Sequence, residues 1–236
     1  MITLLGTGHV FNLRARVKDE IRKRQPAVVA LELDPNRFQA LRNPHMPRRK
    51  APFVYQMLAD FQERLAKDAG IRPGDEMLAA SEAAEEIGVP VALIDADAQR
   101  TFARLRQEMT FGEKMRGIGS ILASAFIRSK AVDEQVREME ADYAAYFEAL
   151  GEKFPTVKRV LLDERNAHMA NELVKAAERF PTIVAVVGDG HVDGMSRLLA
   201  ARGLAVESLR LKDLRGPPPP EPGSSASATV SFDYRE

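Results

Sequence analysis

Two histidines occupy matching positions near the two ends of the chain, in the patterns Gly6-Thr7-Gly8-His9 and Gly188-Asp189-Gly190-His191. Each pattern follows a run of apolar and β-branched residues that is typical of a strand, at residues 2–5 and 182–187. Both histidines are therefore expected just beyond the carboxyl end of a strand. The small residues before each histidine allow a sharp turn and a close approach of substrate. Four glycines are accordingly candidate substrate-binding residues: Gly6, Gly8, Gly188 and Gly190.

Carboxylates end the other two well-defined apolar runs. Glu32 and Asp34 lie at the end of the run 27–33, and Asp95 with Asp97 ends the run 89–95. In open α/β sheets, ligands bind outside the carboxyl ends of the strands. The sequence thus predicts one site that gathers imidazoles and carboxylates from several strand ends.

A divalent metal ion fits this set of side chains, because two imidazoles with one carboxylate are a common ligand set. The predicted ligands are His9, His191 and Glu32, for zinc, manganese or cobalt. Such an ion would lower the pKa of a bound water and supply hydroxide near neutral pH. Glu32 would either complete the ligand set or act as general base.

Structural roles are open for the same residues. A histidine at a strand end can simply cap a helix or bond a carbonyl, and Asp34, Asp95 and Asp97 can each cap the helix that follows. A lone carboxylate inside an apolar strand is costly unless it is paired. The alternative for Glu32 is therefore a buried ion pair, with Arg37 or Arg165 as its partner.

Three further residues are predicted to contact substrate, and two to take part in catalysis. Arg100, one turn into the helix after Asp97, could face the strand ends, and it joins Arg37 and Asp95 as a substrate-binding candidate. Glu164 and Arg165 lie beside the apolar face of a long helical pattern. A guanidinium there could stabilise charge that develops on a substrate oxygen. Ordinary surface pairing is the alternative for this couple.

The elements that must position these residues alternate between strand and helix, which predicts an α/β fold with a mixed, largely parallel sheet flanked by helices. The domain is expected to span 1–214, with a helical insertion at about 104–156, and a proline-rich linker and tail at 215–236. Strands are predicted at 2–5, 27–33, 89–95, 182–187 and 205–211. Helices are predicted at 11–24, after Asp34-Pro35, at 53–69, at 75–87, across most of 110–180, and at 192–201.

An apolar stripe with helical spacing runs through the insertion: Phe111, Met115, Ile118, Leu122 and Phe126. Packing in the core or within a helical hairpin is the first interpretation. A homodimer interface is the second.

Composition narrows the classes of function. The chain has 236 residues, no cysteine, and 34 basic against 34 acidic side chains. Thiol chemistry is excluded, and the balanced charge argues against a nucleic-acid partner. The sequence has no apolar run long enough to span a membrane and no signal peptide, so a cytoplasmic location is expected. Three motifs are missing from the sequence: the third glycine of a dinucleotide-binding fingerprint, a phosphate-binding loop and the Gly-x-Ser-x-Gly elbow of serine hydrolases.

Taken together, the motifs resemble the TraB family, which includes the PrgY pheromone-shutdown proteins, GumN-like proteins and the Tiki proteases. The matching segments occur in order over about residues 1–200: 6–9, 29–37, 74–77, 91–97, 163–170 and 186–194. The resemblance implies a fold shared with ChaN-like and erythromycin-esterase-like proteins. In the Tiki branch, paired Gly-x-x-His motifs and a glutamate are tied to metal-dependent peptide cleavage.

Carried over to this chain, the resemblance implies His9, Glu32 and His191 as the metal site, with Arg165 as a partner. A metal-dependent hydrolase that acts on peptides is thus the leading hypothesis. The alternative is a non-catalytic protein that sequesters a peptide or small ligand, as pheromone shutdown would require, and a weaker one is haem or metal binding by analogy with ChaN. The chain departs from many microbial relatives, which continue into C-terminal membrane helices.

Overall fold

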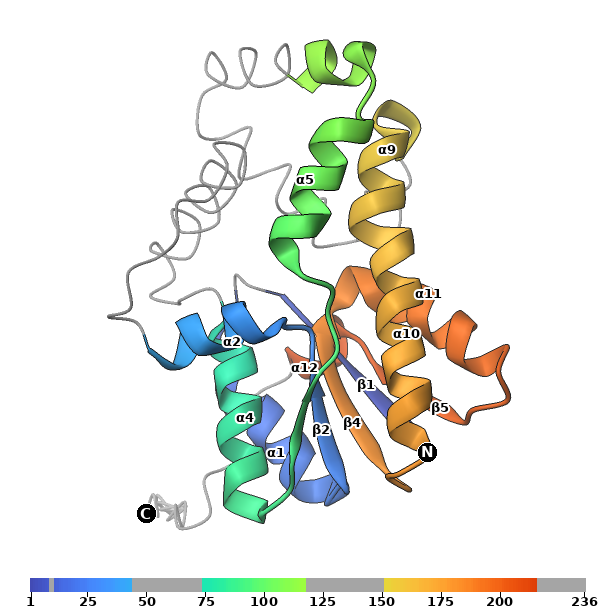
Figure 1. Cartoon of the computed structure of the whole chain (residues 1–236). Coiled ribbons are helices and arrows are strands. Elements are labelled where there is room, and N and C mark those ends of the chain that lie inside the picture. The colour runs from blue at the N-terminus through green and yellow to red at the C-terminus, as the bar shows by residue number, and fades with distance from the viewer. Residues whose placement is uncertain (9–10, 44–73, 118–150, 216–236) are drawn as a thin grey trace, which may run out of the picture.

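The sheet has five parallel strands in the order β3-β2-β4-β1-β5 (Figure 1). This computed structural model describes residues 1–8, 11–43, 74–117 and 151–215. The strands are β1 Ile2–Thr7, β2 Val28–Leu31, β3 Val91–Leu93, β4 Ile183–Gly188 and β5 Val206–Leu209. The predicted α/β fold is confirmed, and the described strands are all parallel rather than mixed.

Helices cover both faces of the sheet. Their bounds are α1 Arg14–Arg24, α2 Pro35–Arg42, α4 Asp75–Ile87, α5 Ala98–Glu108, α9 Pro155–Lys158, α10 Glu164–Ala177, α11 Asp189–Ala200 and α12 Leu211–Leu214. Residues 111–117 are also helical, and a π-helical stretch, Arg159–Asp163, joins α9 to α10. Figure 1 shows α5 and α9 extending beyond the carboxyl edge of the sheet, so these helices rise over the predicted site.

Two apolar layers explain why the strand sequences are almost continuously apolar. On one face, Leu5 and Val29 pack with Val17 of α1 and Ala80 of α4. On the other face, alternate strand residues pack against α10 and α11: Leu4, Ala30 and Ala185 with Met169, Leu173 and Met195. Because successive strand side chains point to opposite faces, a strand covered on both sides needs apolar residues at every position.

Local sequence signals set several element boundaries as predicted. Asp34 accepts hydrogen bonds from the N–H groups of Asn36 and Arg37 at 2.9 and 3.1 Å, and so caps α2. Asp97 caps α5 by accepting from the Arg100 N–H at 2.8 Å. Helix α4 ends at Gly88, where φ is 74°. A left-handed residue after a helix is most easily supplied by glycine.

Several predicted boundaries were wrong: the strands predicted at 27–33, 89–95 and 205–211 are shorter, and two helices start elsewhere. Helix α1 begins at Arg14 rather than at residue 11, and no side chain caps its start. Helix α11 begins at Asp189 rather than at 192, so Gly190 and His191 lie in its first turn instead of in a loop. An acidic residue in the first turn favours a helix start there, and Asp189 supplies it.

The two ends of the predicted insertion are tied together by Glu113. Its carboxylate accepts from the Thr110 N–H at 2.9 Å and from the Thr156 N–H at 2.8 Å, and the side chain is 1% exposed. Phe111 and Met115, the first members of the apolar stripe, are 79% and 49% exposed in the described part of the chain. The rest of the stripe, helix 53–69 and the tail 216–236 lie outside the described residues, so a homodimer stays a prediction.

Candidate functional site

A buried glutamate occupies the carboxyl edge of the sheet. Glu32 directly follows β2 and is 8% exposed. Its Oε2 accepts a hydrogen bond from the Gly188 N–H at 2.6 Å, and its Oε1 accepts from Arg165 Nη2. The same Oε1 faces Nε2 of His191 at 3.3 Å. Glu32 thereby joins the ends of β2 and β4 to helices α10 and α11.

Arg165 sits between two carboxylates. Besides Glu32, it donates to Asp95 through Nε at 3.0 Å and Nη2 at 2.8 Å, and through Nη1 to the Leu161 carbonyl of the π-helical stretch at 3.2 Å. A guanidinium has five N–H groups, and these bonds use four of them. Arg165 is thus fixed in place, and one N–H on Nη1 has no acceptor among the described residues.

The structure shows which of the two predicted arginine partners pairs with Glu32. Arg165 takes Glu32, while Arg37 pairs with Asp95 through Nη1 and Oδ2 at 2.9 Å. Asp95, 7% exposed, also accepts from the Ala96 N–H at 2.8 Å. Its oxygens and Arg37 are therefore engaged within the protein, although both residues lie beside the site for which they were predicted.

The ionised state of Glu32 is favoured by its neighbours. Burial alone would raise the pKa of Glu32, but the charges of His191 and Arg165 and the Gly188 N–H outweigh burial and hold that pKa well below its ordinary value. Burial likewise disfavours the charged form of Arg165, yet Glu32 and Asp95 raise the pKa of the guanidinium above its usual range. The cluster is therefore ionic.

Asn166 orients His191, which is 7% exposed. The Nδ1 atom of His191 lies 2.7 Å from Oδ1 of Asn166, and Asn166 is itself 4% exposed. An amide oxygen only accepts, so Nδ1 carries the hydrogen and Nε2 is the nitrogen directed at Glu32. Gly194 makes the contact possible, because a Cβ added there would lie 2.2 Å from Asn166 Nδ2.

The contact between His191 and Glu32 suits a shared cation. With only lone pairs facing each other, Nε2 and Oε1 would repel at 3.3 Å, so a proton on Nε2 or a metal ion is needed between them. Two ligand atoms of a tetrahedral zinc ion also lie about 3.3 Å apart, given bonds of about 2.0–2.1 Å. His191 and Glu32 thus fit as two ligands of one ion.

The full ligand set cannot be assembled from the residues that the structure describes. Among them, no group of three or more His, Asp or Glu side chains is placed to hold a metal ion. His9, the predicted third ligand, lies outside the described residues. Parallel pairing sets Thr7 of β1 opposite Gly188 of β4, so the two glycine patterns lie side by side at the same edge of the sheet.

A second charged cluster explains the glycine at position 6. Asp189, 6% exposed, accepts from Nε and Nη2 of Arg210 at 2.9 and 2.8 Å and from the Leu211 N–H at 2.8 Å. A Cβ on Gly6 would lie 2.3 Å from Asp189 Oδ1. The small size of Gly6 therefore admits this carboxylate, which is a structural reason. Gly190 lines a surface hollow near Arg210 on the far side of α10.

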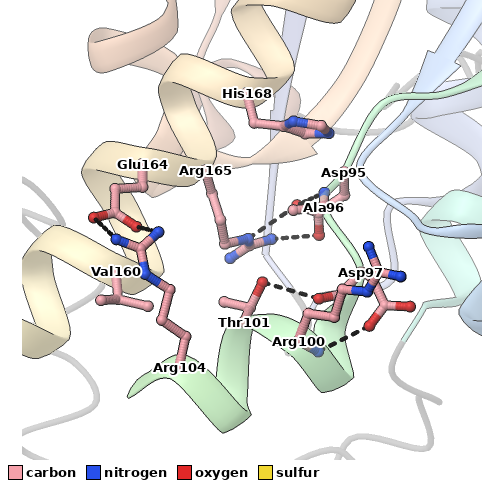
Figure 2. A pocket seen from close by; sticks show the side chains of 10 residues that line it. All are labelled: Asp95, Ala96, Asp97, Arg100, Thr101, Arg104, Val160, Glu164, Arg165 and His168. Atoms are coloured by element: carbon pink, nitrogen blue, oxygen red, sulfur yellow. Dashed lines mark hydrogen bonds and ion pairs between the residues drawn. The ribbon is translucent and has the colours of Figure 1, made fainter. Parts of the chain in front are cut away.

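A cleft of about 490 Å³ lies between α5 and α10 and borders the Glu32 cluster (Figure 2). Its lining residues are Asp95, Ala96, Asp97, Arg100, Thr101, Arg104, Val160, Glu164, Arg165 and His168. Glu164, predicted to be catalytic, pairs with Arg104 at 2.7 Å and with Arg159 at 2.7 Å. It lies on the cleft wall and does not contact Glu32 or His191.

The family can now be assigned, because a model of the TraB/PrgY/gumN family matches residues 1–208. The chain belongs to this family. The match includes every described residue of the Glu32 cluster and of the cleft. The resemblance drawn from the separate motifs is confirmed.

One similar protein is the uncharacterized protein MJ1365 of Methanocaldococcus jannaschii, 35% identical over 210 residues. The match covers 84% of this chain and 53% of that protein, so the chain spans about half the length of this relative. No helix among the described residues is long and apolar enough to cross a membrane.

Two residues of the Glu32 and Asp189 clusters were not assigned roles from the sequence. Asn166 follows Arg165 in the motif 163–170, and its polar side chain in a helical pattern was the signal available. Arg210, the partner of Asp189, lies just after β5 and gives no local signal, because its role depends on a contact across 21 residues.

Proposed function

We propose that this TraB-family chain is a metal-dependent hydrolase that cleaves peptides at the carboxyl edge of its sheet. The observation that carries the proposal is the contact between His191 Nε2 and Glu32 Oε1 at 3.3 Å. Both side chains are oriented by a second hydrogen bond, His191 by one to Asn166 and Glu32 by one from the Gly188 N–H. Two ligand atoms with fixed directions are what a catalytic metal site requires.

The metal ion would be held by His191, Glu32 and His9. When bound, it would lower the pKa of a coordinated water and so supply hydroxide near neutral pH. Zinc, manganese and cobalt are all compatible with imidazole and carboxylate ligands.

The other residues of the cluster keep these ligands in the protonation state that binds a metal ion. Arg165 stabilises the ionised form of Glu32, which is the form that binds a cation. Asn166 keeps the Nδ1 hydrogen of His191 in place, so that Nε2 remains available. The remaining N–H of Arg165 on Nη1 is the group that would donate to a substrate oxygen on the cleft side.

Metal content tests the proposal directly. Wild type, His191→Ala and the matched control His168→Ala should be dialysed against chelator, resupplied with zinc, manganese or cobalt, and measured by elemental analysis. We expect near-stoichiometric metal in wild type and His168→Ala, and little in His191→Ala, with folding checked by circular dichroism. His191→Gln serves if the alanine variant does not fold.

Cleavage of a peptide library by the metal-loaded protein then tests the reaction. Metal-dependent products that disappear in His191→Ala support the hydrolase. Equal metal in wild type and His191→Ala, or no metal in wild type together with no gain in melting temperature on adding ions, would overturn the metal site.

A second candidate is a protein that binds a peptide or small ligand without cleaving it. The observation that favours it is the engagement of Arg165, which spends four of its five N–H groups inside the protein. Peptides that bind the metal-free protein and emerge uncleaved from the metal-loaded one would support this candidate.

A further inference from the structure

We propose that the cleft between α5 and α10 contains a subsite for a carboxylate of the substrate, formed by Arg100 and His168. The two side chains come from opposite walls of the cleft, Arg100 from the first turn of α5 and His168 from α10 (Figure 2). The inference rests on the proposed function, because it takes the bond to be cleaved to lie at the Glu32 cluster that the cleft borders.

The acidic side chains of the cleft already have partners. Asp95 is held by Arg165 and Arg37, at 2.8 and 2.9 Å. Glu164 pairs with two arginines, Arg104 and Arg159. These carboxylates are neutralised from within the protein, so they do not provide a site for a cationic group of the substrate.

Arg100 and His168 differ from these groups. Within the described chain, neither the guanidinium of Arg100 nor the imidazole of His168 forms a hydrogen bond or ion pair, and both residues are exposed. The nearest acid along the chain, Asp97, uses Oδ1 to accept from the backbone N–H of Arg100 and forms no ion pair with its guanidinium. The two polar side chains of the cleft that form no bond at all to the described residues are therefore both basic.

These donors match a carboxylate. A guanidinium binds a carboxylate through two parallel N–H bonds, and an imidazole N–H adds a third from the opposite wall. The first turn of a helix also favours a nearby anion, and Arg100 lies in the first turn of the eleven-residue helix α5. A peptide can present a carboxylate either as an acidic side chain or as its free C-terminus.

The position of Arg100 and His168 relative to the Glu32 cluster indicates which part of a substrate they would contact. Asp95 and Arg165 belong both to the cleft and to the Glu32 cluster, and His168 lies one helical turn after Arg165. A peptide whose scissile bond lies at Glu32 and His191 would place a neighbouring residue between α5 and α10. Arg100 and His168 would then select a carboxylate on that residue.

Three matched peptides separate the sources of the carboxylate: Ala-Ala-Glu-Ala amide, Ala-Ala-Gln-Ala amide and Ala-Ala-Gln-Ala free acid. Binding by isothermal titration calorimetry and cleavage by mass spectrometry should be measured for the 236-residue wild type, Arg100→Gln and His168→Gln. Arg106→Gln, on an exposed position of α5 outside the cleft lining, is the matched control.

We expect wild type and Arg106→Gln to prefer a charged peptide over the neutral one by about ten-fold or more, as hydrogen bonds to charged groups allow. Arg100→Gln should reduce that ratio toward one, and His168→Gln should reduce it less. A preference for the glutamate peptide identifies an acidic side chain as the ligand, and a preference for the free acid identifies the C-terminus.

The two proposals fail in different ways. Cleavage without any preference for charge, or a preference that Arg100→Gln leaves intact, overturns the subsite and keeps the hydrolase. Charge-selective binding that depends on Arg100 but yields no cleavage keeps the subsite and overturns the hydrolase. No binding of either charged peptide overturns the subsite.

Discussion

The described part of the molecule has two buried carboxylate–arginine clusters at the carboxyl edge of its sheet, one around Glu32 and one around Asp189. In the Asp189 cluster, every contact joins a donor to an acceptor: Arg210 and the Leu211 N–H donate, and the carboxylate accepts. The Glu32 cluster has one contact, to His191 Nε2, that is favourable only with a proton or a cation between the two atoms. Burial of charge alone therefore does not mark a functional site.

The largest expected effect is a loss of folding stability when the arginine of the Glu32 cluster is replaced. Arg165→Met leaves Glu32 and Asp95 buried without their main partner, and it should lower the free energy of unfolding by about 3–5 kcal/mol, as breaking buried ion pairs does. Urea unfolding at pH 7 measures this loss. Arg159→Met, which removes exposed pairs with Glu108 and Glu164, should leave the free energy of unfolding nearly unchanged.

Arg210→Met provides the comparison with the other cluster. It should also destabilise the protein, while metal content and peptide binding of the folded variant stay at the wild-type level. Loss of metal in folded Arg210→Met, or a loss of less than about 1 kcal/mol in Arg165→Met, would remove the distinction between the clusters.

A smaller effect tests how His191 is held. Gly194→Ala places a Cβ 2.2 Å from Asn166 Nδ2, so Asn166 has to move away from His191. The unfolding free energy should fall by about 1–3 kcal/mol, and metal affinity by about 10–100-fold, as for lost partners of a ligand. Gly112→Ala is the control, because a Cβ there meets nothing within 4 Å, and unchanged metal affinity in Gly194→Ala would contradict the role of Asn166.

The smallest effect concerns Glu113, a carboxylate outside both clusters. It shows how strongly the free energy of unfolding depends on pH when a carboxylate has hydrogen bonds but, among the described residues, no ion pair. Burial would raise the pKa of Glu113, but hydrogen bonds from Thr110 and Thr156 lower it to about 2. A folded-state pKa below the ordinary value of 4.5 stabilises the protein above that pH, and this stability is lost as the pH falls toward 2. Glu113→Gln should cost about 1 kcal/mol at pH 7.

Urea unfolding at pH 7, 4 and 3 measures the contribution of Glu113. The difference between wild type and Glu113→Gln should shrink as the pH falls, because Glu113 takes up its proton at a higher pH in the unfolded chain than in the folded protein. A difference that stays constant down to pH 3 would show that the carboxylate charge has no part in the cap.

Much of the secondary structure could be predicted from the sequence, because its signals are local. The caps at Asp34 and Asp97 and the end of α4 at Gly88 each depend on residues within one helical turn. The π-helical stretch before Arg165 was not predicted, and neither was the start of α11 at Asp189. Asp189, the acidic residue in the first turn of α11, was the local signal available for that helix start.

The sequence by itself determined that apolar parallel strands alternate with helices and that carboxylates and a histidine stand at their carboxyl ends. Only the tertiary structure decided which charges pair: Arg165 with Glu32 across 133 residues, and the Gly188 N–H with Glu32 across 156. The physical reason is that strand order and register set these contacts, and register follows from packing of the whole sheet. Local propensity could place Glu32, Arg165 and His191 on their elements but could not bring them together.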